Sequence, residues 1–228
     1  MIVVLGKSIP TELGELLKPS SSAMLIIDMQ NDYCSDSGAV ASAGGDTSGY
    51  EAIISRIAHL ADECRQLGVL VIHVRTLTMQ DGRSDSAAWL RLRVRANINY
   101  GSGNSGPWMF TVEGTWGADF VPALVPKAGD LVVTKHRSTA FHQTDLDLIL
   151  RSNGITTLIV CGCTTEGCVE STVRDATFYD YFPIVPDDCV GSDSIALHNA
   201  SLTVMGAYRA DISNATEISR LLTLGPPK

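Results

Sequence analysis

The stretch that decides the fold is TTLIVCGCTTEG, residues 156–167, which is followed directly by Cys168. Its first half is a short run of apolar and β-branched residues without polar alternation, as expected for a strand buried on both faces. Its second half is a turn rich in Thr and Gly, and helical spacing begins directly after it. A buried strand that leads straight into a helix predicts a parallel sheet covered by helices.

Similar apolar runs recur at residues 23–28, 69–75, 131–134, 182–185 and, more weakly, 207–212. Helical patterns lie between them at residues 50–67, 144–151, 169–176 and 195–206, and Gly68 is placed to end the first of these helices. This alternation predicts an α/β fold, a three-layer α/β/α sandwich with a Rossmann-like parallel sheet and right-handed crossovers. Ligands of such sheets bind beyond the carboxyl ends of the strands, where we expect the functional site.

Length and charge limit the number of domains and the kinds of binding partner that this chain can have. The chain has 228 residues, which favours a single domain over residues 1–228. Its formal net charge is −8 and it has no large basic cluster, which disfavours a nucleic-acid or anionic membrane partner. The apolar runs are shorter than the roughly 18–20 residues that span a bilayer, and residues 1–5 are too few for a signal peptide. We therefore expect a soluble cytoplasmic protein.

Residues 78–117 differ from the rest of the domain. The segment is polar, rich in Gly and Arg, and contains Trp89, Trp108 and Trp116. A stretch of this length without clear periodicity is more often functional than idle, so it is expected to act as a lid or an oligomer contact.

Three polar residues follow apolar strands and should meet at one edge of the sheet. They are Asp28, Lys135 and Cys168, and they combine a base, a cation and a thiol. With Thr165 as N-cap, Cys168 would lie in a first helical turn, where backbone N–H groups favour a thiolate and rapid alkylation near neutral pH. Taken singly, a buried apolar Cys, a turn-capping Asp and a solvated Lys are competing interpretations.

Three motifs resemble one family. The strings LIIDMQNDY (25–33), KHRSTAF (135–141) and CGCTTEGCVESTVRDA (161–176) are similar to those of the isochorismatase-like cysteine hydrolases. The resemblance implies a six-stranded parallel sheet and a catalytic triad of Asp28, Lys135 and Cys168. It also implies a cis peptide bond between Cys163 and Thr164, with the N–H groups of Thr164 and Cys168 as oxyanion hole, and a homodimer or homotetramer.

Differences between this sequence and the motifs of individual subfamilies limit the candidate substrates. Residues 71–85, VIHVRTLTMQDGRSD, lack the Asp-x-His motif of metal-binding nicotinamidases, so no metal or cofactor is expected. Cys168 argues for C–N cleavage rather than the vinyl-ether chemistry of isochorismatase. The resemblance is greatest to ureidoacrylate and N-carbamoyl amidohydrolases. It implies hydrolysis of a small linear amide or ureido compound through a thioester, with water as co-substrate and release of ammonia or an amine. A non-catalytic binding protein, or hydrolysis of nicotinamide or maleamate, remains the alternative.

Substrate-binding candidates come from residues near these strand ends and in the segment 78–117. Arg side chains suit a substrate carboxylate, amides suit a leaving group, and aromatic rings suit a pocket wall, although turn formation and core packing compete with each assignment. The candidates are Gln30, Asn31, Arg75, Trp116, Arg137 and Phe141.

Overall fold

The computed structural model describes residues 1–99 and 109–225 of the chain. Its centre is a sheet of seven strands, β3 (Ser22–Ile27), β4 (Leu70–Thr76), β5 (Leu131–Lys135), β6 (Thr157–Cys163), β7 (Phe182–Pro186), β8 (Val190–Gly191) and β9 (Asp211–Ser213). The strand pairs are parallel, in the order β5-β4-β3-β6-β7-β9. The two-residue β8 pairs with the last two residues of β6 and adds a seventh strand to the six of this path. The prediction of an α/β fold with a parallel sheet is confirmed.

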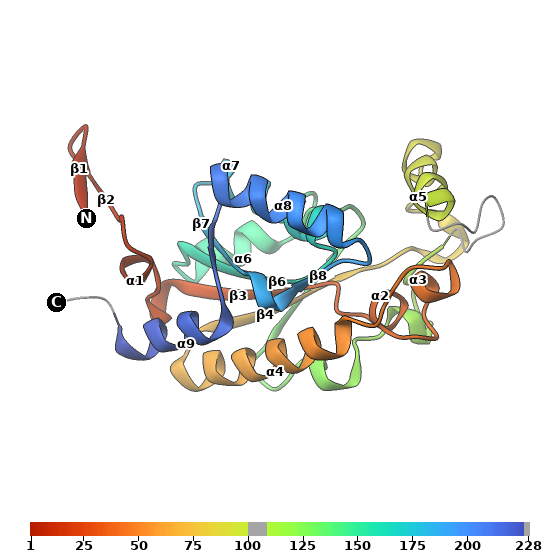
Figure 1. The fold of residues 1–228 in the computed structure, drawn as a ribbon, viewed down its shortest axis with the longest axis horizontal. Helices are drawn as coiled ribbons and strands as arrows, with labels where there is room; N and C mark the ends of the chain where they lie inside the picture. The colour runs from red at the N-terminus through yellow and green to blue at the C-terminus, as the bar shows by residue number, and fades with distance from the viewer. Residues whose placement is uncertain (100–108, 226–228) are drawn as a thin grey trace.

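Helices cover both faces of the sheet, as Figure 1 shows. One layer contains α4 (Tyr50–Leu67) and α9 (Ala215–Leu224), and the other contains α6 (Leu146–Ser152), α7 (Glu170–Phe178) and α8 (Ile195–Tyr208). Helix α4 matches its predicted bounds because Gly68, with φ +79°, adopts the left-handed conformation that ends a helix. The weakly predicted strand 207–212 is wrong in its first half, since α8 continues to Tyr208 and only Asp211–Ser213 is extended.

The central strand β3 shows why the apolar runs are continuous. Successive side chains of a strand point to opposite faces of the sheet. Met24 and Ile26 pack in the core against α4, while Leu25 and Ile27 pack in the second core on the other face. The whole strand is buried, so both faces require apolar residues.

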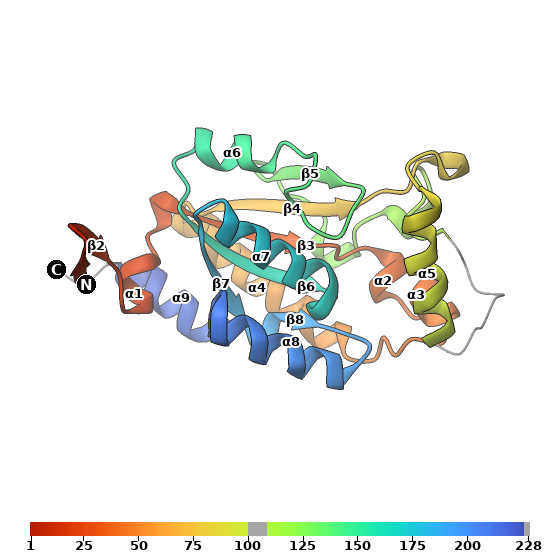
Figure 2. The same cartoon turned by 90° about the horizontal axis from the view of Figure 1, so that it is seen from above.

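Further elements lie at the two ends of the sheet. An exposed hairpin of β1 (Ile2–Val4) and β2 (Lys7–Ile9) projects from the body, next to α1 (Leu13–Leu16). At the opposite end, where the strands have their carboxyl ends, lie α2 (Asn31–Cys34), α3 (Ala39–Ser42) and α5 (Ala87–Asn99) (Figure 2). Short 3₁₀ turns occur at Pro19–Ser21, Gln80–Gly82, Trp116–Ala118, Pro122–Leu124 and Asp187–Cys189.

Part of the segment 78–117 forms a regular helix. Helix α5 takes up thirteen of its residues, although the sequence there shows no clear periodicity. Trp108, one of the three tryptophans singled out there, lies outside the described residues. Within residues 1–99 and 109–225, no helix combines the length and the apolar character that a membrane crossing requires.

Gly162 in β6 is a position that accepts no side chain. Its φ is +114°, and a Cβ atom there would lie 2.1 Å from the backbone oxygen of Ile27 in the neighbouring strand. We expect Gly162→Ala to lower the free energy of unfolding by about 3 kcal/mol or more, since both backbones belong to one ladder. Urea denaturation measures this loss. Gly68→Ala is the control, because Gly68 also has a positive φ but faces open space. Equal losses in the two variants would contradict the explanation by steric overlap.

Candidate functional site

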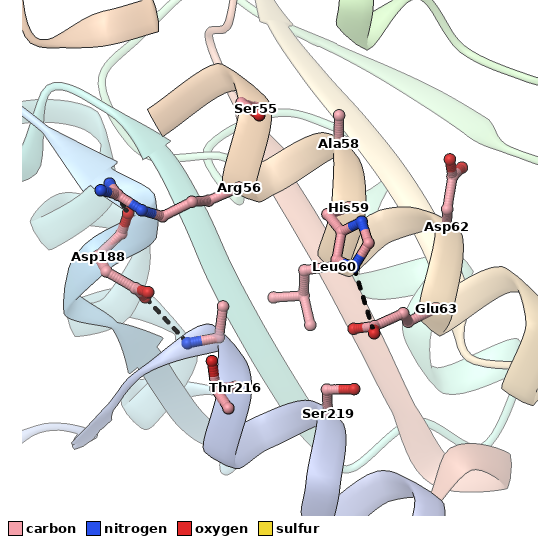
Figure 3. Close-up of a pocket in the computed structure, with 11 residues that line it drawn as sticks. Ser55, Arg56, Ala58, His59, Leu60, Asp62, Glu63, Asp188, Thr216 and Ser219 are labelled. Carbon is pink, nitrogen blue, oxygen red and sulfur yellow. Dashed lines mark hydrogen bonds and ion pairs between the residues drawn. The ribbon is translucent and has the colours of Figure 1, made fainter. Parts of the chain in front are cut away.

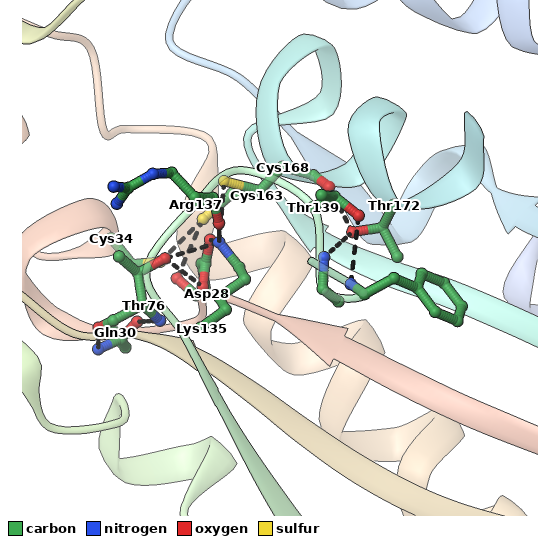
Figure 4. A network of polar contacts seen from close by, with 12 residues as sticks. Asp28, Gln30, Cys34, Thr76, Lys135, Arg137, Thr139, Cys163, Cys168 and Thr172 are labelled. Carbon is green, nitrogen blue, oxygen red and sulfur yellow. Dashed lines mark hydrogen bonds and ion pairs between the residues drawn. The ribbon is translucent and has the colours of Figure 1, made fainter. Parts of the chain in front are cut away.

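The three predicted strand-end residues meet at the carboxyl edge of the sheet. Asp28 directly follows β3, Lys135 ends β5, and Cys168 lies in the turn between β6 and α7. The ammonium nitrogen Nζ of Lys135 lies 2.7 Å from Oδ2 of Asp28 and 3.3 Å from Sγ of Cys168 (Figure 4). Asp28 and Lys135 are almost completely buried, so one desolvated cation contacts both a carboxylate and a thiol.

Thr76 completes this cluster and was missed by the sequence analysis. Its hydroxyl donates to Oδ1 of Asp28 at 3.0 Å and accepts from Nζ of Lys135 at 2.7 Å. Asp28 itself has φ +53°, a conformation that non-glycine residues rarely adopt and that is common at functional sites. Because it contacts both groups, the Thr76 hydroxyl holds the Asp28 carboxylate and the Lys135 ammonium in a fixed arrangement.

The turn that contains Cys168 differs from the predicted helix start. Residues Thr165–Val169 form a π-helical turn with Thr164 as its N-cap, and α7 begins only at Glu170. Thr165 is therefore not the N-cap, since its hydroxyl contacts Nδ1 of His198 at 2.8 Å instead. The predicted cis peptide bond between Cys163 and Thr164 is present. π-helical turns within helices are frequent at functional sites, which agrees with the placement of Cys168.

A cavity of about 230 Å³ opens over Cys168. Lys135, Thr164, Gly167 and Cys168 line it at the sheet edge, and Arg137 also reaches it. The guanidinium of Arg137 donates to the backbone oxygens of Ser84 and His136, and no carboxylate of the described residues forms an ion pair with it. Arg137 is thus the one candidate of the six predicted substrate-binding residues that the described structure places on this cavity.

The other five candidates have different surroundings. The Gln30 side chain bonds the backbone of Thr76 and Ala118, and Asn31 donates to the backbone oxygen of Trp116. These amides tie the loop after β3 to the segment that precedes β5. Both are buried and fully engaged in local contacts, which explains why they do not line the cavity.

The remaining three, Arg75, Trp116 and Phe141, also lie away from the cavity lining. Arg75 donates to the Thr134 hydroxyl on the adjacent strand. The Trp116 side chain is 52% exposed, and Phe141 is buried against two tyrosine rings of the turn between α7 and β7. The structure therefore does not place these three, the possible anchor Arg75 and the two possible wall residues, at the cavity over Cys168.

The charge state of Cys168 differs from the expectation. Burial raises the pKa of the Cys168 thiol to about 12, and the negative charge of Asp28 adds to this effect, while Lys135 opposes it. Burial alone would lower the pKa of Lys135, but the charges of Asp28 and Cys168 raise it. The direction of this pKa shift is opposite to the one expected from the sequence, and it favours a protonated Cys168 thiol beside the charged ammonium of Lys135.

Alkylation tests this charge state. At neutral pH, we expect Cys168 to react slowly with iodoacetamide, and the rate to rise about tenfold per pH unit up to about pH 10, because only the thiolate reacts. Free cysteine, with a pKa of about 8.5, is the reference and levels off earlier. Peptide mapping by mass spectrometry assigns the modified residue. A rate at Cys168 that levels off below pH 8 would contradict a protonated resting thiol.

A larger cavity of about 760 Å³ lies elsewhere, between α4 and α9 (Figure 3). Its walls are mostly polar surface residues, among them Arg56, His59 and Glu63. His59 and Glu63 contact each other one helical turn apart. Within residues 1–99 and 109–225, no group of three or more His, Cys, Asp or Glu side chains is arranged to hold a metal ion. Cys168 and Lys135 line the smaller cavity instead.

Sequence relatives match most of the chain. Residues 22–217 match the family described as Isochorismatase domain. The ureidoacrylate amidohydrolase RutB of Agrobacterium fabrum is 35% identical over 176 residues, which cover 75% of this chain and 76% of that protein. The protein of the same name from Variovorax paradoxus is 34% identical over 209 residues, or 90% of this chain and 82% of that protein.

Solved structures share the fold. A cysteine hydrolase from Pseudomonas syringae pv. phaseolicola has a TM-score of 0.78 at 25% identity, and the match covers 92% of this chain and 95% of that one. An N-carbamoylsarcosine amidase from Thermoplasma acidophilum has a TM-score of 0.66 at 24% identity, with 86% and 96% covered, and is similar in fold.

Proposed function

The chain belongs to the isochorismatase family, and we propose that it is a cysteine-dependent amidohydrolase that cleaves a C–N bond of a small amide or ureido compound. One observation carries this proposal: a single buried ammonium lies 2.7 Å from a carboxylate and 3.3 Å from a thiol at the end of a cavity. The names of the relatives support C–N cleavage, since ureidoacrylate amidohydrolases are among them.

In the first step, Asp28 accepts the proton of the Cys168 thiol while Sγ attacks the carbonyl carbon of the substrate. The N–H groups of Thr164 and Cys168 hold the oxyanion, a form of stabilisation worth about 2.7–4 kcal/mol per donor in enzymes of this kind. The C–N bond then breaks, and ammonia or an amine leaves with the proton that Asp28 returns. The product of this step is a thioester between Cys168 and the acyl or carbamoyl group.

In the second step, water hydrolyses the thioester. Asp28 removes a proton from the water molecule, the hydroxide adds to the carbonyl carbon, and the C–S bond breaks. The proton returns to Sγ, so the thiol and the carboxylate are restored. Lys135 remains charged throughout, because its pKa is raised, and it stabilises the negative charge that moves between Asp28 and Cys168.

Other parts of the chain have proposed roles in the same reaction. Arg137 is the candidate anchor for a substrate carboxylate, since its guanidinium reaches the cavity. We also propose that residues 1–228 form one domain in which residues 78–117 cover the site or contact a second copy, in a homodimer or homotetramer.

A screen for ammonia release tests the function. The compounds are ureido acids, carbamoyl amino acids, biuret, nicotinamide and maleamate, each with the unmodified protein and with a Cys168 variant. We expect release from a ureido or carbamoyl compound, and loss of that release in the variant. Ammonia release from nicotinamide or maleamate alone would identify those amides as the substrate class instead. No release from any of them, together with tight binding of one, would favour a non-catalytic binding protein.

A further inference from the structure

The surface of the cavity over Cys168 is mostly apolar. Arg93, Arg137, Ser138 and Thr164 also line it, and the apolar part of the wall is formed by Tyr33, Val40, Trp89, Leu92 and Phe110. Three of these five side chains are aromatic. Such a surface is stabilised by contact with apolar groups and gains little from contact with water or a small polar molecule.

Helix α5 supplies one wall. Trp89, Leu92 and Arg93 are spaced three and four residues apart, so they lie on one face of the helix, and all three line the cavity. Arg137 lies over the Trp89 ring, 5.0 Å from its centroid, and Arg93 lies over the Phe110 ring at 5.8 Å. Cation–π contacts of this kind hold the two rings in place as a preformed wall.

The indole nitrogen of Trp89 is shielded from the open cavity. Nε1 is buried, and it has no hydrogen-bond partner among the residues that the structure describes. Buried indole N–H groups usually have an acceptor. Nε1 has almost no accessible surface, so a bound substrate would meet the indole ring rather than this donor.

We propose that the substrate carries an apolar group of several carbon atoms, which packs against Trp89, Leu92 and Phe110, and that α5 selects for it. This inference rests on the proposed function, because it places the scissile amide at Cys168. It differs from the expectation of a small, polar ureido acid, for which five apolar side chains around the bound molecule are a poor match.

A series of straight-chain primary amides from propanamide to hexanamide tests this selection in the unmodified protein. Ammonia release gives kcat/KM for each amide. We expect kcat/KM to rise about fourfold per added methylene group, which corresponds to about 0.8 kcal/mol of burial each. Measurable hydrolysis with a flat or falling series would overturn this inference and leave the proposed function in place. No hydrolysis of these amides or of the ureido and carbamoyl compounds would overturn both.

Variants of Trp89 in α5 test whether this helix causes the dependence of kcat/KM on the length of the amide. Trp89→Ala should lower kcat/KM for hexanamide about tenfold but that for propanamide less than threefold, so the slope of the series falls. Trp89→Phe keeps an aromatic ring on this wall and should keep the slope of the series. Tyr208→Ala, which removes a 77% exposed ring at the end of α8, is the control and should leave the series unchanged. An unchanged slope in Trp89→Ala would contradict the assignment to α5.

Discussion

Replacement of Cys168 by alanine is expected to reduce kcat/KM by about 10⁴-fold or more without unfolding the protein. Loss of a nucleophile removes the covalent pathway, and measured losses of this kind in other hydrolases are of this size or larger. The fold should persist, because Cys168 lies at the cavity surface and only partly packs against the second core. Ammonia release and far-UV circular dichroism measure the two effects.

Cys64→Ala is the matched control for this substitution. Cys64 lies in α4, in the core on the opposite face of the sheet, and is fully buried. The control should lose stability through the small cavity it creates but keep its activity within about twofold, whereas Cys168→Ala should do the opposite. An active Cys168→Ala protein would rule out the nucleophile.

Replacement of Lys135 by methionine should have the largest effect on stability. The variant leaves the Asp28 carboxylate buried without its cation, and breaking a buried pair in this way costs about 3–5 kcal/mol. Activity should fall as well, because the charge that stabilises Asp28 and Cys168 is lost. Urea denaturation at neutral pH gives the change in the free energy of unfolding.

Lys127→Met is the corresponding control on the surface. Lys127 also contacts a carboxylate, Asp62, at 2.6 Å, but both side chains are about half exposed. Exposed pairs contribute at most about 1 kcal/mol, so this variant should remain near the stability of the unmodified protein. A loss in Lys135→Met no greater than that of Lys127→Met would show that the buried pair does not stabilise the fold.

The central cluster was predictable because parallel strands share an edge. Asp28 and Lys135 follow apolar runs that are buried on both faces, so their positions at the carboxyl edge followed from the runs themselves. Thr76 was missed through an error of one residue. The predicted strand ended at Arg75, whereas β4 ends at Thr76. Adjacent side chains of a strand point to opposite faces, so the Thr76 hydroxyl contacts Asp28, whereas Arg75, proposed as an Arg near the segment 78–117, contacts Thr134.

The cavity wall was not predictable from spacing. In α5, the charged residues Arg91, Arg93 and Arg95 interrupt the apolar pattern, and no clear stripe marks the face that carries Trp89 and Leu92. That face is defined by contacts with Arg137 and Phe110, which come from distant parts of the chain. The sequence instead favoured Trp116 and Phe141, and neither of these aromatic residues lines the cavity.

The charge state of Cys168 depends on burial, which sequence position alone does not give. The neighbouring ammonium and the helix start both suggested a thiolate. In the structure, desolvation and the nearby Asp28 carboxylate outweigh Lys135 and raise the pKa of the thiol. Once the burial of Asp28, Lys135 and Cys168 is known, these residues favour a neutral thiol at Cys168 rather than a thiolate.

Rapid acid quench of the working enzyme, followed by mass spectrometry, tests the central claim most directly. Tryptic cleavage after Arg151 and Arg174 gives one peptide, residues 152–174, that contains Cys161, Cys163 and Cys168. With a substrate that is turned over, this peptide should gain the mass of the acyl or carbamoyl group, less one hydrogen, and fragment ions should place the addition on Cys168. Turnover without any adduct on Cys168 as hydrolysis proceeds, or with the adduct on another residue, would contradict the proposed thioester mechanism.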